Sequence, residues 1–150
     1  MNVTLAQAEE IVREALVEGT RLGKALSVAV VDSGGFTVLI QRSDGARPLT
    51  PSIAQAKAYT SAVMQRPSRM LKGWQDSNPV FFSQISQLAN LPIVATDGGV
   101  TLKRDGEIIG GLGISGGTAE EDQEVADATL ERLGYTLDFP AWGKPATPGH

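Results

Sequence analysis

The chain has 150 residues, a length that suits one compact domain burying roughly 68–70% of its unfolded surface. Its 41% hydrophobic and 20% charged residues are typical of a globular protein. A formal net charge of −4 and the lack of a basic run argue against a protein that coats nucleic acid, which needs clustered Lys and Arg. No Cys is present, which excludes disulfides, a thiolate nucleophile and cysteine metal sites.

The beginning of the chain, Met1–Thr4, has neither a charged leader nor an apolar core segment. No stretch approaches the roughly 20 apolar residues of a membrane span. We therefore expect a cytoplasmic protein whose partners are neither membranes nor nucleic acid.

The first predicted element is an amphipathic helix. Its apolar residues between Leu5 and Leu22 recur at helical spacing, and Thr4 with Gln7 has the spacing of a capping box. The pattern predicts that this helix ends near Gly23.

A strand hairpin is predicted next, over residues 27–31 and 36–40, with the turn Asp32-Ser33-Gly34-Gly35 between them. Its two runs are apolar on both faces. We therefore expect this sheet to be covered on both sides, by helices or by another subunit.

A second helix is predicted from Ser52 to about Met64, with Thr50 as its cap and Pro51 at its first position. Alanines give this helix small side chains, which allow close approach to a sheet or to a symmetry-related helix. Alanine is also simply a good helix former. We favour core packing as the reason for the alanines.

The middle of the chain has weaker patterns. Residues 69–74 and 80–88 are typical of two short helices around Asp76-Ser77-Asn78-Pro79, and residues 91–95 resemble another strand.

The last third predicts a second hairpin and a final helix. Asp105-Gly106 is a strong hairpin signal, because the tight turn needs positive φ. The final helix is predicted over residues 119–133, with Thr118 and Glu121 as a capping box and Gly134 at its end. Strands joined by hairpins and flanked by helices predict a single α+β domain with an antiparallel sheet. The proline-rich segment 135–150 is expected to be an extended tail.

The doubled glycine before the final helix is the best local candidate for a ligand contact. Backbone N–H groups at the junction Gly116-Gly117-Thr118 point outward, and the helix dipole adds positive charge, which suits a carboxylate or phosphate. Arg42 follows a strand and Lys57 is the only basic residue of the alanine-rich helix, so both are candidate ligand contacts. Thr60 lies three residues after Lys57 and shares its helical face.

Three carboxylates are candidate bases for acid/base chemistry: Asp32, Asp44 and Asp122. Turn chemistry alone also explains Asp32 and Asp44. An acidic cluster sits at a helix start, where negative charge stabilises the dipole, so no metal site is predicted at Glu120, Glu121, Asp122 and Glu124. The only His, His150, is the last residue and a poor place for a base or a metal ligand.

Several segments together resemble the GlcG/HbpS family, which also occurs as the C-terminal domain of PduO-type proteins. The matching pieces are Val30-Val31-Asp32-Ser33-Gly34-Gly35, Arg42-Ser43-Asp44-Gly45-Ala46, Lys57-Ala58-Tyr59-Thr60, and Gly98-Gly99 through Gly116-Gly117-Thr118 with Asp122. They come in family order, and the resemblance covers roughly residues 4 to 134.

The resemblance implies a domain over residues 1–134 with a five-stranded antiparallel sheet flanked by helices, and assembly into dimers and larger rings or octamers. Several family members bind haem, which makes haem a candidate cofactor. The family's haem binders rely on His, whereas no His lies within the matching region here.

Three functions are compatible with these patterns. The leading hypothesis is a homo-oligomer that binds a small anionic or aromatic molecule near Arg42, Lys57, Thr60 and the glycine junction. The alternative is a cofactor-independent lyase or isomerase that acts on a small organic acid through the three carboxylates. The third is a structural or regulatory subunit whose glycines serve only turns and packing.

Overall fold

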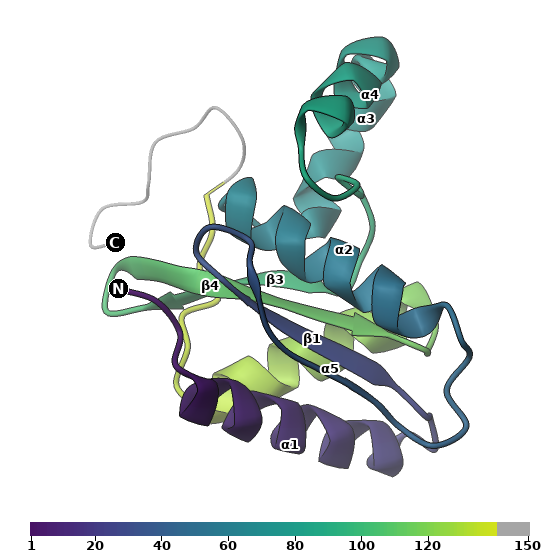
Figure 1. Ribbon diagram of the computed structural model, residues 1–150, viewed down its shortest axis with the longest axis vertical. Coiled ribbons are helices and arrows are strands. Elements are labelled where there is room, and N and C mark those ends of the chain that lie inside the picture. Colours follow the sequence, from purple (N-terminus) through teal and green to yellow (C-terminus); the bar gives the residue numbers. More distant parts are fainter. Residues whose placement is uncertain (141–150) are drawn as a thin grey trace.

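A four-stranded antiparallel sheet forms the middle layer of the structure, a computed structural model that describes residues 1–140 (Figure 1). Its strands lie in the order β2-β1-β4-β3. Their bounds are β1 (Ser27–Asp32), β2 (Thr37–Arg42), β3 (Gly99–Arg104) and β4 (Glu107–Ser115).

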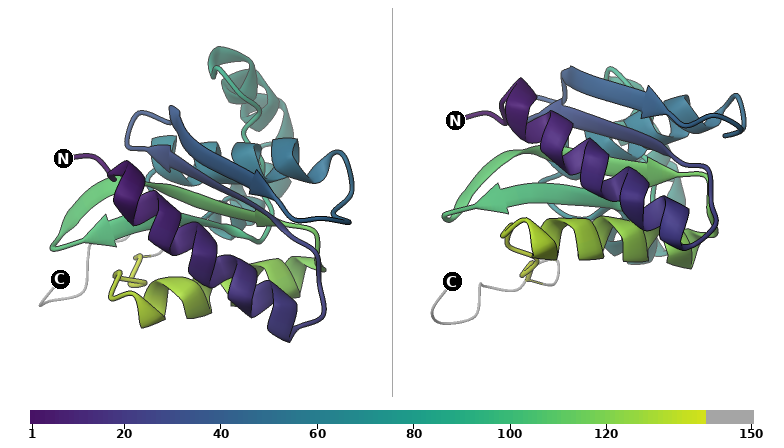
Figure 2. Two further views of the ribbon diagram at one scale, coloured as in Figure 1. Left: turned by 60° about the horizontal axis from the view of Figure 1, so that its bottom comes forward. Right: turned by 90° about the horizontal axis from the view of Figure 1, so that it is seen from below.

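Helices cover the two faces of this sheet unequally. Helices α1 (Leu5–Arg21) and α5 (Ala119–Arg132) lie side by side on one face, and α2 (Thr50–Val63) lies on the other (Figure 2). The elements η1 (Ser68–Leu71), α3 (Lys72–Ser77) and α4 (Pro79–Leu88) form an arm that projects beyond the end of α2 (Figure 1). The predicted α+β class is confirmed.

The expectation of five strands is wrong, because residues 91–95 form no strand. The amide of Val94 donates to Oγ1 of Thr60 at 3.0 Å rather than to a neighbouring strand. Pro92 has no amide to donate, which weakens any ladder at this point. The hydroxyl of Thr60 therefore takes the place of the backbone carbonyl with which a fifth strand would pair at Val94.

Both predicted hairpins are confirmed. Asp105 and Gly106 have φ of 55° and 77°, as the tight turn between β3 and β4 requires. In the β1–β2 turn, Oδ1 of Asp32 accepts from the amides of Gly34 and Phe36 at 2.9 and 3.0 Å. The strand after this turn begins at Thr37, one residue later than predicted.

Two of the three predicted helix caps are confirmed. Both capping boxes are present, Thr4 with Gln7 in α1 and Thr118 with Glu121 in α5. The prediction for α2 is wrong, because Thr50 is its first helical residue and no side chain caps it. The hydroxyl of Thr50 instead donates to the carbonyl of Arg47 at 2.7 Å.

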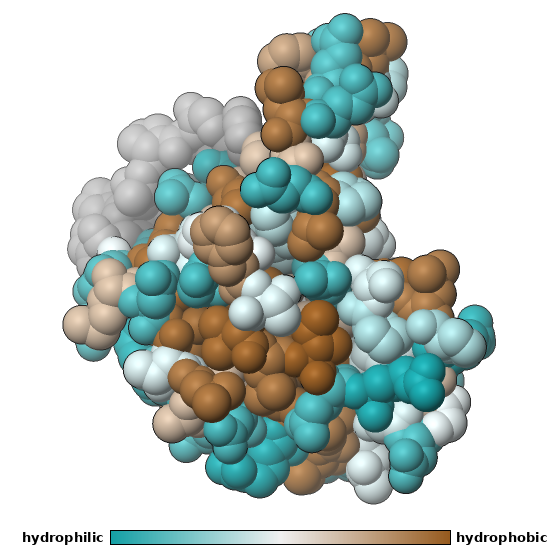
Figure 3. Space-filling model, in the orientation of Figure 1, coloured by the Kyte–Doolittle hydropathy of each residue, from teal (hydrophilic) through white to brown (hydrophobic). Residues whose placement is uncertain are grey.

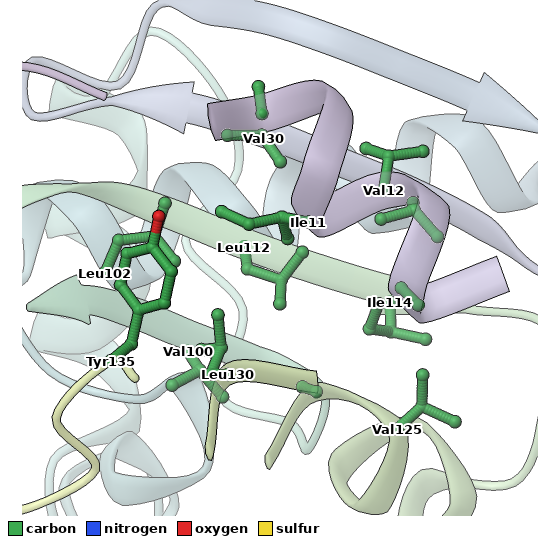
Figure 4. Close-up of a cluster of buried hydrophobic side chains, with 14 of the residues drawn as sticks. Ile11, Val12, Val30, Val100, Leu102, Leu112, Ile114, Val125, Leu130 and Tyr135 are labelled. Carbon is green, nitrogen blue, oxygen red and sulfur yellow. The ribbon is translucent and has the colours of Figure 1, made fainter. Parts of the chain in front are cut away.

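The main hydrophobic core fills the space between the sheet and the helices α1 and α5 (Figure 4). Its fully buried side chains come from the sheet, from α1 and α5, and from Leu26 directly before β1. The largest are Ile11, Val12, Leu26, Val28, Val30, Val100, Leu102, Leu112, Ile114 and Leu130.

The opposite face of the sheet has a thinner core. Ala54, Ala58 and Ala62 of α2 form a buried cluster with Ala29 and Val31 of β1. The alanines of α2 therefore serve core packing against the sheet.

The chain beyond α5 packs on the domain as far as it is described. Tyr135 is buried, and the amide of Thr136 donates to the carbonyl of Lys103 at 2.8 Å. The rest of the predicted tail, with His150, lies outside the described residues. Among residues 1–140, no helix combines the length and the apolar character that crossing a membrane requires.

Candidate functional site

The junction between β4 and α5 lines a cavity of about 390 Å³. Gly116, directly after the end of β4, has a φ of 128°, and a Cβ at this position would lie 2.6 Å from the carbonyl oxygen of Ala25. Only glycine suits this place without strain. The cavity is lined by Lys24, Arg47, Leu49, Thr50, Ile53, Ser115, Gly116, Gly117 and Thr118.

Two backbone amides of the junction already donate within the chain. The amide of Gly117 donates to Oδ1 of Asp122 at 2.9 Å, and the amide of Thr118 donates to Oε1 of Glu121 at 2.9 Å. The chain's own carboxylates thus occupy donors that would suit an anion at a helix N-terminus. A ligand in the cavity would be held by side chains.

Two cationic side chains line the cavity. Nζ of Lys24 lies 3.5 Å from Oε1 of Glu121. Arg47 is exposed, and its guanidinium forms no salt bridge or hydrogen bond within residues 1–140. The exposed side chains of Leu49 and Ile53 supply an apolar wall of the same cavity. The cavity therefore combines an uncompensated positive charge with an apolar surface.

A buried ion pair lies directly behind the junction. Nζ of Lys57 contacts Oδ2 of Asp122 at 2.9 Å and donates to the carbonyl of Ile114 at 2.8 Å. Both charged side chains are only 5% exposed. Burial raises the pKa of Asp122, and the Lys57 charge opposes this shift. Since Asp122 also accepts from Gly117, the pair ties α2, β4 and α5 together at the junction.

The structure thus brings together four of the residues that the sequence singled out: Lys57, Asp122, Gly116 and Gly117. Thr118 begins the same junction as the cap of α5. Of these, only Gly116, Gly117 and Thr118 line the cavity itself.

The other predicted site residues lie elsewhere. Arg42 is exposed at the end of β2, the edge strand, and does not line the cavity. Oγ1 of Thr60 is occupied by the amide of Val94, and the Asp32 carboxylate holds its own turn. Asp44 is exposed in the loop after β2. The acid/base roles of Asp32, Asp44 and Asp122 stay predictions, since none of the three lines the cavity.

Sequence reasoning missed Lys24 and Arg47. Lys24 follows the end of α1 and Arg47 belongs to the loop before α2, so neither has a periodic pattern around it. A pointer to Arg47 was its place beside Pro48, directly before a predicted helix start. Only the packing of that loop against β4 shows that it faces the junction.

A larger groove of about 620 Å³ lies between α1 and β2, where no site was predicted. Its lining combines apolar side chains with polar and charged ones. The lining residues are Glu9, Arg13, Leu16, Val17, Thr20, Leu39 and Gln41.

Neither of these two hollows fits the ligation of haem iron. Haem iron is held in proteins by His, Cys, Met or Tyr side chains. The side chains that line the two hollows offer hydroxyls, an amide, a carboxylate and cations instead. In addition, residues 1–140 contain no group of three or more His, Asp or Glu side chains placed to hold a metal ion.

An antiparallel sheet between helices, with a glycine junction that opens into a small cavity, defines this chain as a small α+β protein with a candidate ligand site. The model of the family described as "Haem degrading protein HbpS-like" matches residues 3–131, and the chain belongs to this family. The predicted GlcG/HbpS membership is confirmed.

Similar proteins agree with this assignment. The chain is 31% identical to Protein GlcG of Escherichia coli K12 over 108 residues, which cover 72% of this chain and 77% of GlcG. It is 30% identical to the corrinoid adenosyltransferase PduO of Salmonella typhimurium over 124 residues, 83% of this chain but only 37% of PduO. A crystal structure of a PduOC–haem complex superposes with a TM-score of 0.82 at 26% identity, covering 91% of this chain and 99% of that one.

Proposed function

We propose that this protein is a cytoplasmic homo-oligomer that binds a small anionic molecule with an apolar or aromatic body in the cavity at the β4–α5 junction. The observation that carries the proposal is the exposed, unpaired guanidinium of Arg47 beside the apolar wall of Leu49 and Ile53. Gly116, Gly117 and Thr118 of the glycine junction line the same cavity.

The chemistry of the lining selects the class of ligand. A guanidinium binds carboxylates and phosphates through paired N–H donors, which favours an anionic head group. Leu49 and Ile53 gain by covering an apolar body, because burial removes their exposed surface from water. Since Gly117 and Thr118 already donate to Asp122 and Glu121, recognition of the anion falls to Arg47 and Lys24.

Haem is one member of this ligand class, as an aromatic molecule with two carboxylates. The description of the family and the PduOC–haem complex support testing it. Because the cavity lacks the usual axial ligands, the proposal gives the haem iron no protein ligand there. Any binding of haem in the cavity would rest on its carboxylates and its flat apolar face.

The test is titration calorimetry of the whole chain with three probes: haemin, benzoate and inorganic phosphate. We expect saturable binding of a probe with an apolar body, and at least a tenfold weaker affinity in Arg47→Gln, since a charge-assisted hydrogen bond contributes about 1.5–3 kcal/mol. Arg42→Gln is the matched control, because it removes an exposed arginine that lies outside the cavity. Equal affinities of the two variants, or no saturable binding of any probe, would overturn the proposal.

A further inference from the structure

Helix α1 carries an exposed stripe of four residues, Leu5, Glu9, Arg13 and Val17. Each lies next to the following one at i, i+4 spacing, so the four form one slanted row on the helix surface, whose direction turns by about 40° per step. The two ends of the stripe are apolar and open to water, with Leu5 55% and Val17 50% exposed. Read from either end, the stripe runs from an apolar residue through two opposite charges to an apolar residue.

The charges of this stripe have no partner within the described fold. Glu9 and Arg13 form no salt bridge or hydrogen bond through their side chains within residues 1–140, although they are four residues apart. On another side of α1, Glu14 and Glu18 both bind Arg132 of α5. The fold therefore uses the acidic residues that face α5 and leaves the stripe unpaired.

The surroundings of the stripe are also open. Glu9, Arg13 and Val17 line the groove between α1 and β2, and β2 is an edge strand with no neighbour on its outer side among residues 1–140. Figure 3 shows apolar surface gathered between α1 at the bottom of the view and α2 above it. An unprotected edge strand beside exposed apolar side chains is typical of a surface that another chain covers.

We infer that the stripe is the surface on which a second copy of this chain docks, with the two α1 helices antiparallel and a twofold axis passing between Glu9 and Arg13. The inference rests on the self-assembly part of the proposed function and names its interface. A twofold axis makes each contact occur twice. Leu5 then meets the partner's Val17, and Glu9 meets the partner's Arg13.

The order of the four residues is what selects a second copy over another protein. The numbers of each pair, 5 with 17 and 9 with 13, are symmetric about position 11, so a single axis satisfies both pairs. In a parallel arrangement, each charged residue would face the same residue of the second chain, and the two like charges would repel each other. Opposite charges at such positions set the partner and the direction of helix pairing.

Charge reversal tests the pairing. The assembly of the whole chain is measured by sedimentation equilibrium over a range of concentrations. We expect Glu9→Arg and Arg13→Glu each to weaken dimer formation at least tenfold, because each places like charges opposite one another. An equimolar mixture of the two variants should dimerise as well as the unchanged chain, since each Arg then faces a Glu. Glu124→Arg, the same charge change on the exposed surface of α5, is the control and should change nothing.

Cross-linking tests the direction. Because the chain has no Cys, introduced thiols report only on their own positions. A mixture of Leu5→Cys and Val17→Cys should form a mixed disulfide dimer under oxidation, whereas each variant alone should not. A self-linked Val17→Cys dimer would indicate parallel helices and overturn the inference.

The remaining outcomes separate the inference from the proposal on which it rests. If the unchanged chain sediments as a monomer at all concentrations, both the interface and the proposed self-assembly are wrong. If it assembles but neither charge variant weakens the assembly, only the interface is wrong. Ligand binding at Arg47 is measured independently of either result.

Discussion

At the scale of single residues, the buried pair of Lys57 and Asp122 is the most consequential contact of the structure. Moving two charges out of water costs several kcal/mol each, and only good geometry and further hydrogen bonds offset this cost. Here Lys57 donates to the carbonyl of Ile114, and Asp122 accepts from Gly117. The pair therefore holds the backbone on both sides of the junction, and its loss should affect more than one ionic contact.

Removal of one partner should be strongly destabilising. Lys57→Met leaves Asp122 buried without its cation, which is expected to lower the free energy of unfolding by about 3–5 kcal/mol. Lys57→Met with Asp122→Asn should cost less than Lys57→Met alone, because the uncompensated charge is gone while the acceptor for Gly117 remains. Urea unfolding followed by circular dichroism measures the free energy of unfolding of the single and the double variant.

The matched control is Lys72, which pairs with Asp97 at 3.0 Å but is half exposed. Lys72→Met should cost at most about 1 kcal/mol, as is usual for a surface pair. Equal decreases in the free energy of unfolding for Lys57→Met and Lys72→Met would contradict the role given to the buried pair.

At the scale of elements, the contact between α2 and β4 depends on glycines. A Cβ at Gly111 would lie 2.3 Å from the carbonyl oxygen of Ala58, and one at Gly113 would lie 1.9 Å from that of Ala54. Side chains are therefore excluded where the helix backbone crosses this strand. Glycines on the strand and alanines on the helix together set how close the two layers can lie.

Substitution of one of these glycines should push the layers apart. Gly113→Ala forces the helix away from the sheet and is expected to lower stability by about 1–3 kcal/mol or more. Gly73→Ala in α3 is the control, since no atom of the described residues 1–140 lies within 4 Å of its added Cβ, and it should be neutral or stabilising by about 0.5–1 kcal/mol. Thermal unfolding of the two variants measures the difference. If Gly73→Ala lost as much stability as Gly113→Ala, the packing of α2 against β4 would not be the cause of the loss.

The elements also show where sequence reasoning succeeds. Asp105-Gly106 and the two capping boxes are local, because the residues that form each contact are neighbours in the chain. The false strand at residues 91–95 is not local, since a strand requires a partner that the sequence does not name. The glycines of β4 belong to the second hairpin, which was predicted, but their close contact with α2 involves residues more than fifty positions away.

The same distinction applies to the candidate site. The glycine junction was predicted because its helix start and its glycines are adjacent in sequence. Arg42 ends β2 and Arg47 lies in the loop that follows, and only the path of this loop decides which of them reaches the cavity. Lys57 was expected to face a ligand, yet its partner Asp122 lies 65 positions away and draws it into the interior.

At the scale of the whole molecule, the described residues form three hydrophobic clusters: the main core, the alanine cluster between α2 and β1, and a small cluster at the arm. The sheet with α1 and α5 encloses the main core, whereas the arm of η1, α3 and α4 is held by a separate cluster of Tyr59, Leu71, Phe82 and Ile93. The arm also leaves Val80, Phe81 and Leu88 exposed. Segments with few buried apolar contacts open at a lower free-energy cost than the rest of a domain.

The arm should therefore open without unfolding the sheet. Phe82→Ala removes a large side chain from the small cluster, so amides of residues 68–93 should exchange with deuterium faster while those of β1 and β4 keep their protection. Leu112→Ala is the contrast, because Leu112 is fully buried in the main core beneath α1 and should accelerate exchange in the sheet and the arm alike. Equal acceleration of β1 and β4 in Phe82→Ala would mean that the two cores unfold as one unit. Tyr59 of the small cluster and Lys57 of the buried pair lie on the same helix, α2. Opening of the arm therefore changes the structure of the glycine junction only if α2 opens as one cooperative unit.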